Sequence, residues 1–277
     1  MRTRTSEQNA VGAARRRDAA NYPRRLAEAD GDVTLDALRT ALRSANSVFV
    51  LTGSGISAES GLPTFRGVGG LWRTHRVEEL ASPLGFARDP ELVWTWYNER
   101  KAAHVRAQPN AGHYALARLE EAIGDFTLAT QNVDSLHLRA GSKRVLELHG
   151  NLREARCTGC DARRRFDADG LPLDQIEHFC GGRFRPDIVW FGEPLPPAVW
   201  REAEAAAARA DVILVAGTSA IVYPAAALAT HYNERAFVAE VNPEPTAISG
   251  RVDCVLRSTA AELLPQLLGD LELPRPT

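Results

Sequence analysis

A buried-strand pattern that runs directly into glycines constrains the fold of this chain more than any other feature. Four consecutive apolar residues, at positions 48–51, are typical of a strand covered on both faces, and Gly53 and Gly55 follow at once. The spacing Gly53-x-Gly55-x-x-Ala58 matches a dinucleotide-binding turn with alanine in the third place. Glycines let the backbone turn tightly beside a ligand, and amides at the start of a helix attract phosphate. On this spacing alone, a nucleotide site and a plain strand-to-helix turn are equally open.

The segment after the glycines favours a dinucleotide site of a particular kind. A hydride-transfer Rossmann unit would continue its helix into a second strand that ends in an acidic residue. This chain instead breaks at Pro63 and continues with Phe65, Arg66 and a glycine-rich loop at residues 67–70. Arginine suits phosphate and an aromatic ring packs against a sugar, so we predict a flap over the ligand. The alternative is a surface loop with one buried phenylalanine.

Strand and helix patterns alternate along the chain and predict an α/β fold with a Rossmann-like, doubly wound parallel sheet. After the first strand, buried strands are expected at residues 126–130 and 145–148, and further strands at 187–191, 212–216, 237–241 and 252–257. Helices are expected at residues 35–45, 90–105, 111–123, 197–210, 224–235 and 260–268. Asp89 and Asn110 are N-cap signals for two of them. Polar residues follow several strand ends, where ligands bind in open α/β sheets.

Residues 151–185 have a different character and predict a small zinc-ribbon-like module inserted into a domain of residues 32–277. Cys157 and Cys160 form a CxxC pair, but the second pair is incomplete, because only Cys180 is present and Glu177 occupies the other place. His178 could complete a Cys3His set; alternatively Glu177 or water does so, or no metal binds. Any zinc here would be structural and remote from the chemistry. Residues 1–31 lack hydrophobic periodicity and predict a flexible N-terminal arm.

Composition excludes several classes of protein. No apolar run among the 277 residues approaches the roughly 20 residues of a membrane helix. The net charge of −2 gives no support for a general or specific affinity for nucleic acid. Four cysteines, two of them in a CxxC pair, are typical of a reducing compartment, so a cytoplasmic location is expected.

Six short motifs, at residues 53–57, 63–66, 130–134, 149–150, 217–219 and 241–242, occur in a recognisable order. Together they resemble the motifs of the sirtuins, which are NAD-dependent protein lysine deacylases. The resemblance extends from about residue 35 to residue 268. Two small departures are Ser54, where the family usually has alanine, and Val133, where isoleucine is usual.

The resemblance implies that the amide oxygen of an acyl-lysine attacks the NAD ribose carbon that carries nicotinamide, which yields nicotinamide and 2′-O-acyl-ADP-ribose. His149 is then the general base that deprotonates a ribose hydroxyl, although a lone histidine at a strand end is more often structural. Asn132 is the second catalytic residue, and Asp134 is assigned with it to the ribose and the nicotinamide amide. The implied NAD-binding residues are Gly53, Ser54, Gly55, Ile56, Ala58, Phe65, Arg66, Trp72, Gln131, Asn132, Val133, Asp134, Gly217, Thr218, Ser219, Asn242, Glu244 and Ala260.

Residues 189–193 resemble the sirtuin segment that lines the peptide cleft and pairs with an extended substrate. This favours a deacylase over a plain NAD hydrolase or a mono-ADP-ribosyltransferase, and the presence of His149 argues against a non-catalytic NAD-sensing or zinc-stabilised binding module. Tyr97 and Arg100, three apart on a predicted helix, resemble the marker of the branch that removes succinyl, malonyl and glutaryl groups. The alternative is a half-buried tyrosine beside a solvated arginine. The implied substrate residues are Ala81, Tyr97, Arg100, Val189, Trp190, Phe191 and Gly192, with Ala81 as the small residue that widens the acyl pocket.

Overall fold

The computed structural model describes residues 31–65, 76–166 and 170–269. Residues 1–30 of the predicted N-terminal arm, the loop at residues 67–70, Arg66 and Trp72 lie outside the described residues, whereas Gly31 already begins the first helix. No helix in the described ranges is long and apolar enough to cross a membrane.

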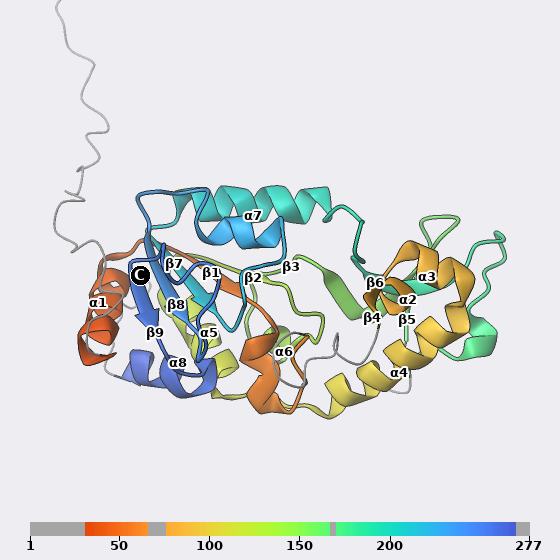
Figure 1. Cartoon of the computed structure of the whole chain (residues 1–277), viewed down its shortest axis with the longest axis horizontal. Helices are drawn as coiled ribbons and strands as arrows, with labels where there is room; N and C mark the ends of the chain where they lie inside the picture. Colours follow the sequence, from red (N-terminus) through yellow and green to blue (C-terminus); the bar gives the residue numbers. More distant parts are fainter. Residues whose placement is uncertain (1–30, 66–75, 167–169, 270–277) are drawn as a thin grey trace, which may run out of the picture.

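The predicted α/β fold with a parallel sheet is confirmed. Six parallel strands lie in the order β3-β2-β1-β7-β8-β9 (Figure 1). Their bounds are β1 Ser47–Thr52, β2 Asp125–Thr130, β3 Val145–Glu147, β7 Val212–Ala216, β8 Phe237–Val241 and β9 Cys254–Leu256. The strand order changes direction beside β1, between β2 and β7. Ligands bind outside the carboxyl ends of the strands at such a switch point, so the sheet itself indicates where a site should lie.

Helices cover both faces of this sheet, as the apolar runs of its strands require. Successive side chains of a strand point to opposite faces. Val48 and Val50 of β1 therefore pack against α1, α5 and α8, whereas Phe49 and Leu51 pack against α7 on the other face (Figure 1). These helices are α1 Gly31–Ser44, α5 Ala111–Ala122, α7 Pro197–Arg209 and α8 Ala260–Gly269.

A smaller unit lies at one end of the sheet, at the right of Figure 1. Its antiparallel sheet has the order β5-β4-β6, formed by β4 Gly150–Cys157, β5 Arg163–Arg165 and β6 Phe184–Ile188. Its core also takes residues from an earlier segment, which forms α2 Val77–Leu80, α3 Pro83–Arg88 and α4 Pro90–Arg106. Trp94 and Trp190 are the largest fully buried side chains of this core. Two distant segments of the chain therefore fold together beside the large sheet.

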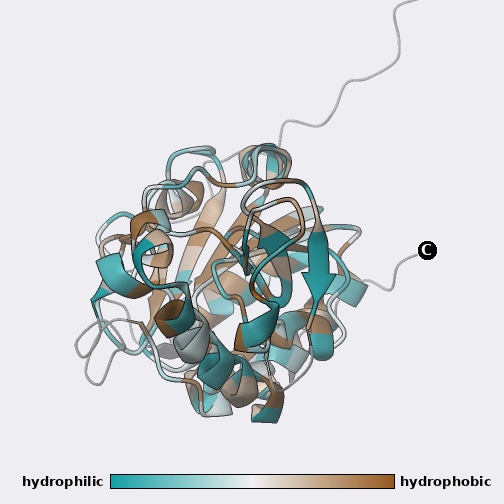
Figure 2. Cartoon of the chain, turned by 90° about the vertical axis from the view of Figure 1, so that its right-hand side faces the viewer, coloured by the Kyte–Doolittle hydropathy of each residue, from teal (hydrophilic) through white to brown (hydrophobic). Residues whose placement is uncertain are grey.

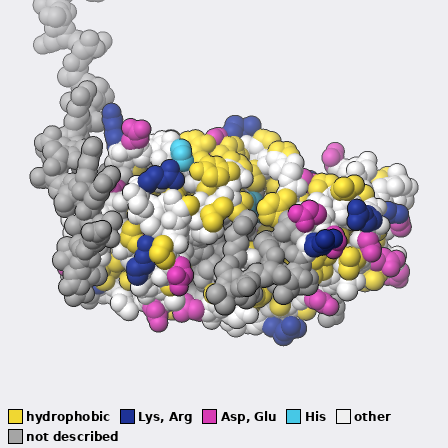
Figure 3. Space-filling model, viewed as in Figure 1, with side chains coloured by type: hydrophobic (Ala, Val, Ile, Leu, Met, Phe, Trp, Pro, Cys, Tyr) yellow, Lys and Arg dark blue, Asp and Glu magenta, His cyan; other side chains and the backbone are white. Residues whose placement is uncertain are grey.

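Charged side chains crowd the surface of the small unit. Figure 2 looks onto this end of the molecule, and Figure 3 shows acidic and basic groups interspersed over it. Arg165 pairs with Glu154 at 3.1 Å, and Arg183 pairs with Glu177 at 2.7 Å. The visible face of the described part therefore carries mixed charge, with no continuous basic surface.

Three sequence predictions of local structure are wrong. Residues 187–191 do not form a strand of the parallel sheet: β6 ends at Ile188 and pairs with β4, and the Trp190 amide donates to the Glu193 carboxylate instead of to a neighbouring strand. Residues 224–235 form only the short 3-10 helix η5, Ala225–Ala229, because the following turn is held by Asn233, which donates to the Ala210 carbonyl. β3 is half-buried instead of buried, since it is an edge strand that pairs only with β2.

The two predicted N-caps are confirmed. The Asp89 side chain accepts a hydrogen bond from the Leu92 amide, and Asn110 accepts one from Gly112. These caps satisfy amides that have no partner inside the helix. They fix the start of α4, which carries Tyr97 and Arg100.

Candidate active site

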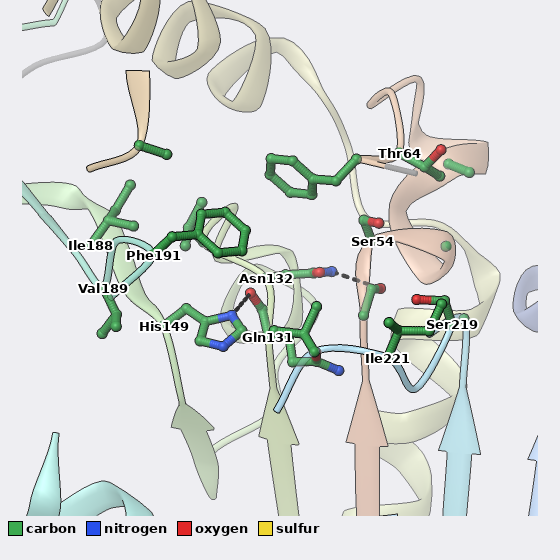
Figure 4. Close-up of a pocket in the computed structure, with 18 of the residues that line it drawn as sticks. Ser54, Thr64, Gln131, Asn132, His149, Ile188, Val189, Phe191, Ser219 and Ile221 are labelled. Atoms are coloured by element: carbon green, nitrogen blue, oxygen red, sulfur yellow. Dashed lines mark hydrogen bonds between the residues drawn. The ribbon is translucent and has the colours of Figure 1, made fainter. Parts of the chain in front are cut away.

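A cavity of about 660 Å³ lies at the carboxyl ends of the parallel strands, between the large sheet and the small unit. It is the place that the sheet topology indicates. Twenty-one residues that the sequence assigned to NAD, catalysis or substrate line its wall: Gly53, Ser54, Gly55, Ala58, Phe65, Ala81, Tyr97, Arg100, Gln131, Asn132, Val133, His149, Val189, Trp190, Phe191, Gly192, Gly217, Ser219, Asn242, Glu244 and Ala260. His149 and Phe191 lie on one side of the cavity, and Ser54, Thr64 and Ser219 lie on the other (Figure 4).

Three assigned residues do not line the cavity but lie behind its wall. Ile56 is fully buried in the core beneath the glycine turn. Thr218 accepts a hydrogen bond from the Gln131 side chain at 3.0 Å, and its carbonyl accepts one from Asn242 at 3.1 Å. Asp134 is buried and accepts a hydrogen bond from Ser57 at 2.8 Å. Their contacts hold lining residues in place.

The glycine turn after β1 touches the turn after β7, backbone to backbone. The Gly55 amide donates to the Gly217 carbonyl at 2.7 Å. Gly217 has a φ of +62°, and a Cβ there would lie 2.3 Å from the Ile56 nitrogen. A residue with a side chain at this position would be both strained and obstructed. Glycine is therefore needed to bring the two strand ends together at the cavity.

His149 is held in the tautomer that a general base needs. Its Nδ1 lies 3.0 Å from the carbonyl oxygen of Gln131, which can only accept, so Nδ1 carries a proton (Figure 4). In the neutral ring Nε2 is then left with a lone pair. Burial lowers the pKa of His149 below the ordinary value of 6.5, and the hydrogen bond to Gln131 partly opposes that shift. The neutral form therefore predominates at physiological pH.

We expect the pH dependence of deacylation to reflect this shift. The base-competent form of His149 is lost only as the pH falls through its lowered pKa, so the acid limb of kcat/KM should lie below 6.5. The test is a pH–rate profile of the wild-type enzyme, with its fold monitored by circular dichroism at each pH. An acid limb centred above 6.5 in folded protein would contradict the assignment.

Asn132 is fixed by a chain of buried hydrogen bonds. Its Nδ2 donates to the Gly53 carbonyl and to Ser57 Oγ, each at 3.1 Å, which leaves its Oδ1 as an acceptor. Ser57 Oγ in turn donates to Asp134 at 2.8 Å. Burial raises the pKa of Asp134, and this bond from Ser57 opposes the rise. This series of hydrogen bonds sets the orientation of the Asn132 amide at the cavity wall.

The sequence analysis missed one stretch of the cavity wall. Residues 221–224, which follow the strand end of β7, line the cavity, and Ile221 lies on the side away from Val189 and Phe191 (Figure 4). Ile221 is 54% exposed and Tyr223 is 63% exposed, although both are large and apolar. An apolar run directly after a polar strand end was the available signal.

The four possible metal ligands of the small unit converge on one point. Cys157, Cys160, Cys180 and His178 offer ligand atoms that all lie within 4.8 Å of one another. Cys157 Sγ is 3.5 Å from Cys180 Sγ, and His178 Nδ1 is 3.1 Å from Cys180 Sγ. Ideal tetrahedral zinc separates two thiolates by about 3.8 Å. The Cys3His set therefore fits a zinc ion.

The surroundings support this fit. The Gly159 amide donates to Cys157 Sγ at 3.4 Å, and a Cβ on Gly182 would lie 2.8 Å from the same sulfur. The alternative ligand Glu177 is instead paired with Arg183. None of the four residues lines the cavity, so a zinc ion here would stabilise the small unit and take no part in the chemistry.

We expect the purified protein to contain about one equivalent of zinc and to melt at least about 5 °C lower after chelation, because metal binding contributes directly to folding. Cys157→Ser should lose the metal. Cys254→Ala is a matched control, since Cys254 is buried outside the cluster, and it should retain the metal. Metal-free protein with unchanged melting would contradict the zinc site.

Comparisons with known proteins agree with this geometry. Residues 53–224 match the model of the Sir2 family. An NAD-dependent protein deacylase 2 of Pyrobaculum aerophilum is 48% identical over 232 residues, which is 83% of this chain and 93% of the relative. A crystal structure of a Sir2 homologue with NAD superposes with a TM-score of 0.80 at 44% identity, over 85% of this chain and 93% of the other. A Sir2 structure with a p53 peptide and NAD is 30% identical, with a TM-score of 0.73, over 85% and 98% of the two chains. The chain therefore belongs to the Sir2 family.

Proposed function

We propose that this NAD-dependent protein deacylase removes succinyl and malonyl groups from protein lysines in preference to acetyl groups, and that it releases nicotinamide and 2′-O-acyl-ADP-ribose. One observation carries the acyl preference. Arg100 places a guanidinium in the cavity wall and forms no ion pair with an acidic residue of the described ranges 31–65, 76–166 and 170–269, although burial lowers its pKa and the charge of the buried Asp134 partly opposes that shift. A carboxylate at the end of the acyl group would form such a pair.

The surroundings of Arg100 hold its guanidinium in place without neutralising it. The group lies 5.0 Å from the ring centroid of Phe65 and 4.6 Å from that of Trp96. Cation–π contacts of this kind fix a guanidinium plane and leave its edge available for hydrogen bonds. Burial lowers the pKa of Arg100 to about 10, so the side chain remains charged at neutral pH. The cavity therefore offers a partly desolvated positive charge.

Tyr97 and Ala81 complete the proposed acyl pocket. Tyr97 lies one turn before Arg100 on α4, and only 4% of it is exposed although it lines the cavity. Its hydroxyl can supply a further hydrogen bond to a carboxylate. Ala81 is also buried at the wall, and its small side chain leaves room for an acyl group longer than acetyl. The contacts of Arg100 with two aromatic rings support this pocket over the alternative of a solvated arginine.

The catalytic roles follow the geometry of the cavity. NAD, when bound, supplies an electrophilic ribose carbon. His149 would accept a proton from a ribose hydroxyl at Nε2 while Nδ1 stays bonded to Gln131. Asn132 would orient the ribose through Oδ1. For the remaining residues that the sequence analysis assigned to NAD, including Arg66 and Trp72, we propose the same NAD contacts.

We assign the peptide to the opening between residues 189–192 and residues 221–223. The amides of Val189 and Phe191 are already bonded to the carbonyls of His149 and Ala81, at 2.9 and 3.0 Å. Pairing with an extended peptide would therefore use other backbone groups of this segment. The Sir2 structure with a p53 peptide supports a protein substrate.

Mass spectrometry of the products tests the reaction class. Incubation with NAD and a succinyl-lysine peptide should yield free lysine and a succinyl-ADP-ribose in equal amounts. Bare ADP-ribose formed without loss of the acyl group would show instead an NAD hydrolase.

A cytoplasmic location is a further part of the proposal. None of the four cysteines forms a disulfide in the structure, and three of them belong to the Cys3His set that fits zinc. Thiolate ligands persist in reducing compartments. Fractionation of the native host would test it, and recovery outside the cytoplasm would contradict it.

A further inference from the structure

We propose that Trp190 is a positioning residue for the acidic end of the acyl group: its indole N–H fixes the Tyr97 hydroxyl so that the phenolic proton points into the acyl pocket. The inference rests on the proposed preference for acidic acyl groups and names a residue through which that preference is set. Trp190 lies in the peptide-lining segment, 93 positions from Tyr97 along the chain.

The direction of the hydrogen bond follows from its chemistry. Trp190 Nε1 lies 2.9 Å from Tyr97 Oη. An indole nitrogen only donates, so the tyrosine oxygen is the acceptor and its own proton must be used elsewhere. No residue of the described ranges accepts that proton, although Tyr97 is only 4% exposed and lines the cavity. A buried donor without a partner is costly, so an acyl carboxylate would be a favoured acceptor.

Tyr97 keeps this proton at neutral pH. Burial raises the pKa of Tyr97 to about 12, and the hydrogen bond from Trp190 and the charge of Arg100 only partly oppose this effect. The hydroxyl therefore keeps its proton and can donate at neutral pH. With Arg100 one turn further along α4, the pocket offers a neutral donor beside a charged one.

Trp190 is itself held rigidly. The Arg185 guanidinium lies 3.3 Å from the centroid of the indole ring, and the Trp190 amide donates to Glu193 at 2.8 Å. Glu193 also accepts from Arg185 at 2.6 Å, which closes the network. A cation over the ring face withdraws electron density from the indole and strengthens its N–H as a donor. The segment proposed to contact the peptide, residues 189–192, is thus joined by hydrogen bonds to the pocket proposed to bind the acyl group.

A double-mutant cycle tests this role. Trp190→Phe should lower the ratio of kcat/KM for succinyl-lysine to that for acetyl-lysine by about tenfold. A factor of this size lies at the upper end of the effect expected from the loss of one neutral hydrogen bond. In the Tyr97→Phe background, Trp190→Phe should leave this ratio unchanged, because the hydroxyl on which Trp190 acts is absent. An equal effect in both backgrounds would overturn the proposal, as would a parallel loss of both activities.

Trp94→Phe is the matched control. Trp94 is fully buried in the same core and also donates its indole N–H, to the Phe184 carbonyl at 2.8 Å, but it does not line the cavity. This substitution should lower stability and leave the succinyl-to-acetyl ratio unchanged. A fall in the ratio equal to that of Trp190→Phe would show a general effect of core packing and would overturn the proposal.

An isosteric replacement keeps the test decisive if Trp190→Phe does not fold. Site-specific β-(3-benzothienyl)alanine at position 190 retains both rings and the stacking on Arg185 but lacks the N–H, and should give the same tenfold fall. Different results would contradict the proposed function and the role of Trp190. If the wild type prefers acetyl-lysine, the proposed function is wrong; if it prefers succinyl-lysine and the isostere keeps the full ratio, only the role of Trp190 is wrong.

Discussion

His149→Ala should lower kcat/KM for deacylation by about 10²- to 10⁴-fold or more, the range of an effective general base. The reason is geometric. His149 lines the cavity, and its bond to the Gln131 carbonyl keeps Nε2 unprotonated. The measurement is steady-state turnover of an acyl-peptide, together with NAD binding by calorimetry and the melting temperature. Fold and much of the NAD affinity should remain, since within the described part of the chain the ring makes a single hydrogen bond, to the Gln131 carbonyl.

His231→Ala serves as the control for loss of a histidine. His231 is exposed and does not line the cavity, so its replacement should leave turnover within about twofold of the wild type. Turnover of His149→Ala protein at the level of this control would remove His149 from the mechanism.

Arg100→Met should reduce transition-state binding of a succinyl-lysine peptide by about 2–4 kcal/mol, which is the effect of losing a charged hydrogen-bond pair. Methionine keeps an apolar chain between Phe65 and Trp96 and removes the charge. Acetyl-lysine has no carboxylate to lose, so its turnover should fall much less. Measurement of kcat/KM for both peptides gives the comparison directly.

Arg106→Met is the matched control on the same helix. Arg106 lies in the last turn of α4, is exposed and does not line the cavity. It should leave the preference between the two peptides unchanged. If Arg100→Met lowers both activities by the same factor, Arg100 is a structural residue and the preference has another origin.

Much of the large sheet could be predicted from the sequence because its strands are short apolar runs bounded by polar residues. β1, β7 and β8 lie within one residue of their expected bounds, and Asp89 and Asn110 start their helices as expected. The failures have a physical cause. The apolar run at residues 187–191 suits either sheet, and only its pairing with β4 decides between them.

The residues of the candidate site could also be predicted only in part. Short motifs at strand ends indicated most residues of the cavity wall, because parallel strands bring their carboxyl ends to one edge. Contacts between distant segments had no such signal. The stacking of Arg100 on Phe65 depends on how the small unit packs against the segment that follows β1, and the bond from Trp190 to Tyr97 depends on how two distant segments pack inside the small unit. Local periodicity carries no information about such pairs.

The central claim is most directly tested by competition between two substrates. Wild-type enzyme receives NAD with equal concentrations of succinyl-lysine and acetyl-lysine forms of one peptide, and mass spectrometry follows both acyl-ADP-ribose products from the start of the reaction. The ratio of the initial rates equals the ratio of the two kcat/KM values. We expect the succinyl product to predominate by about tenfold or more, because only the succinyl group can pair with Arg100. An excess of the acetyl product would contradict the account.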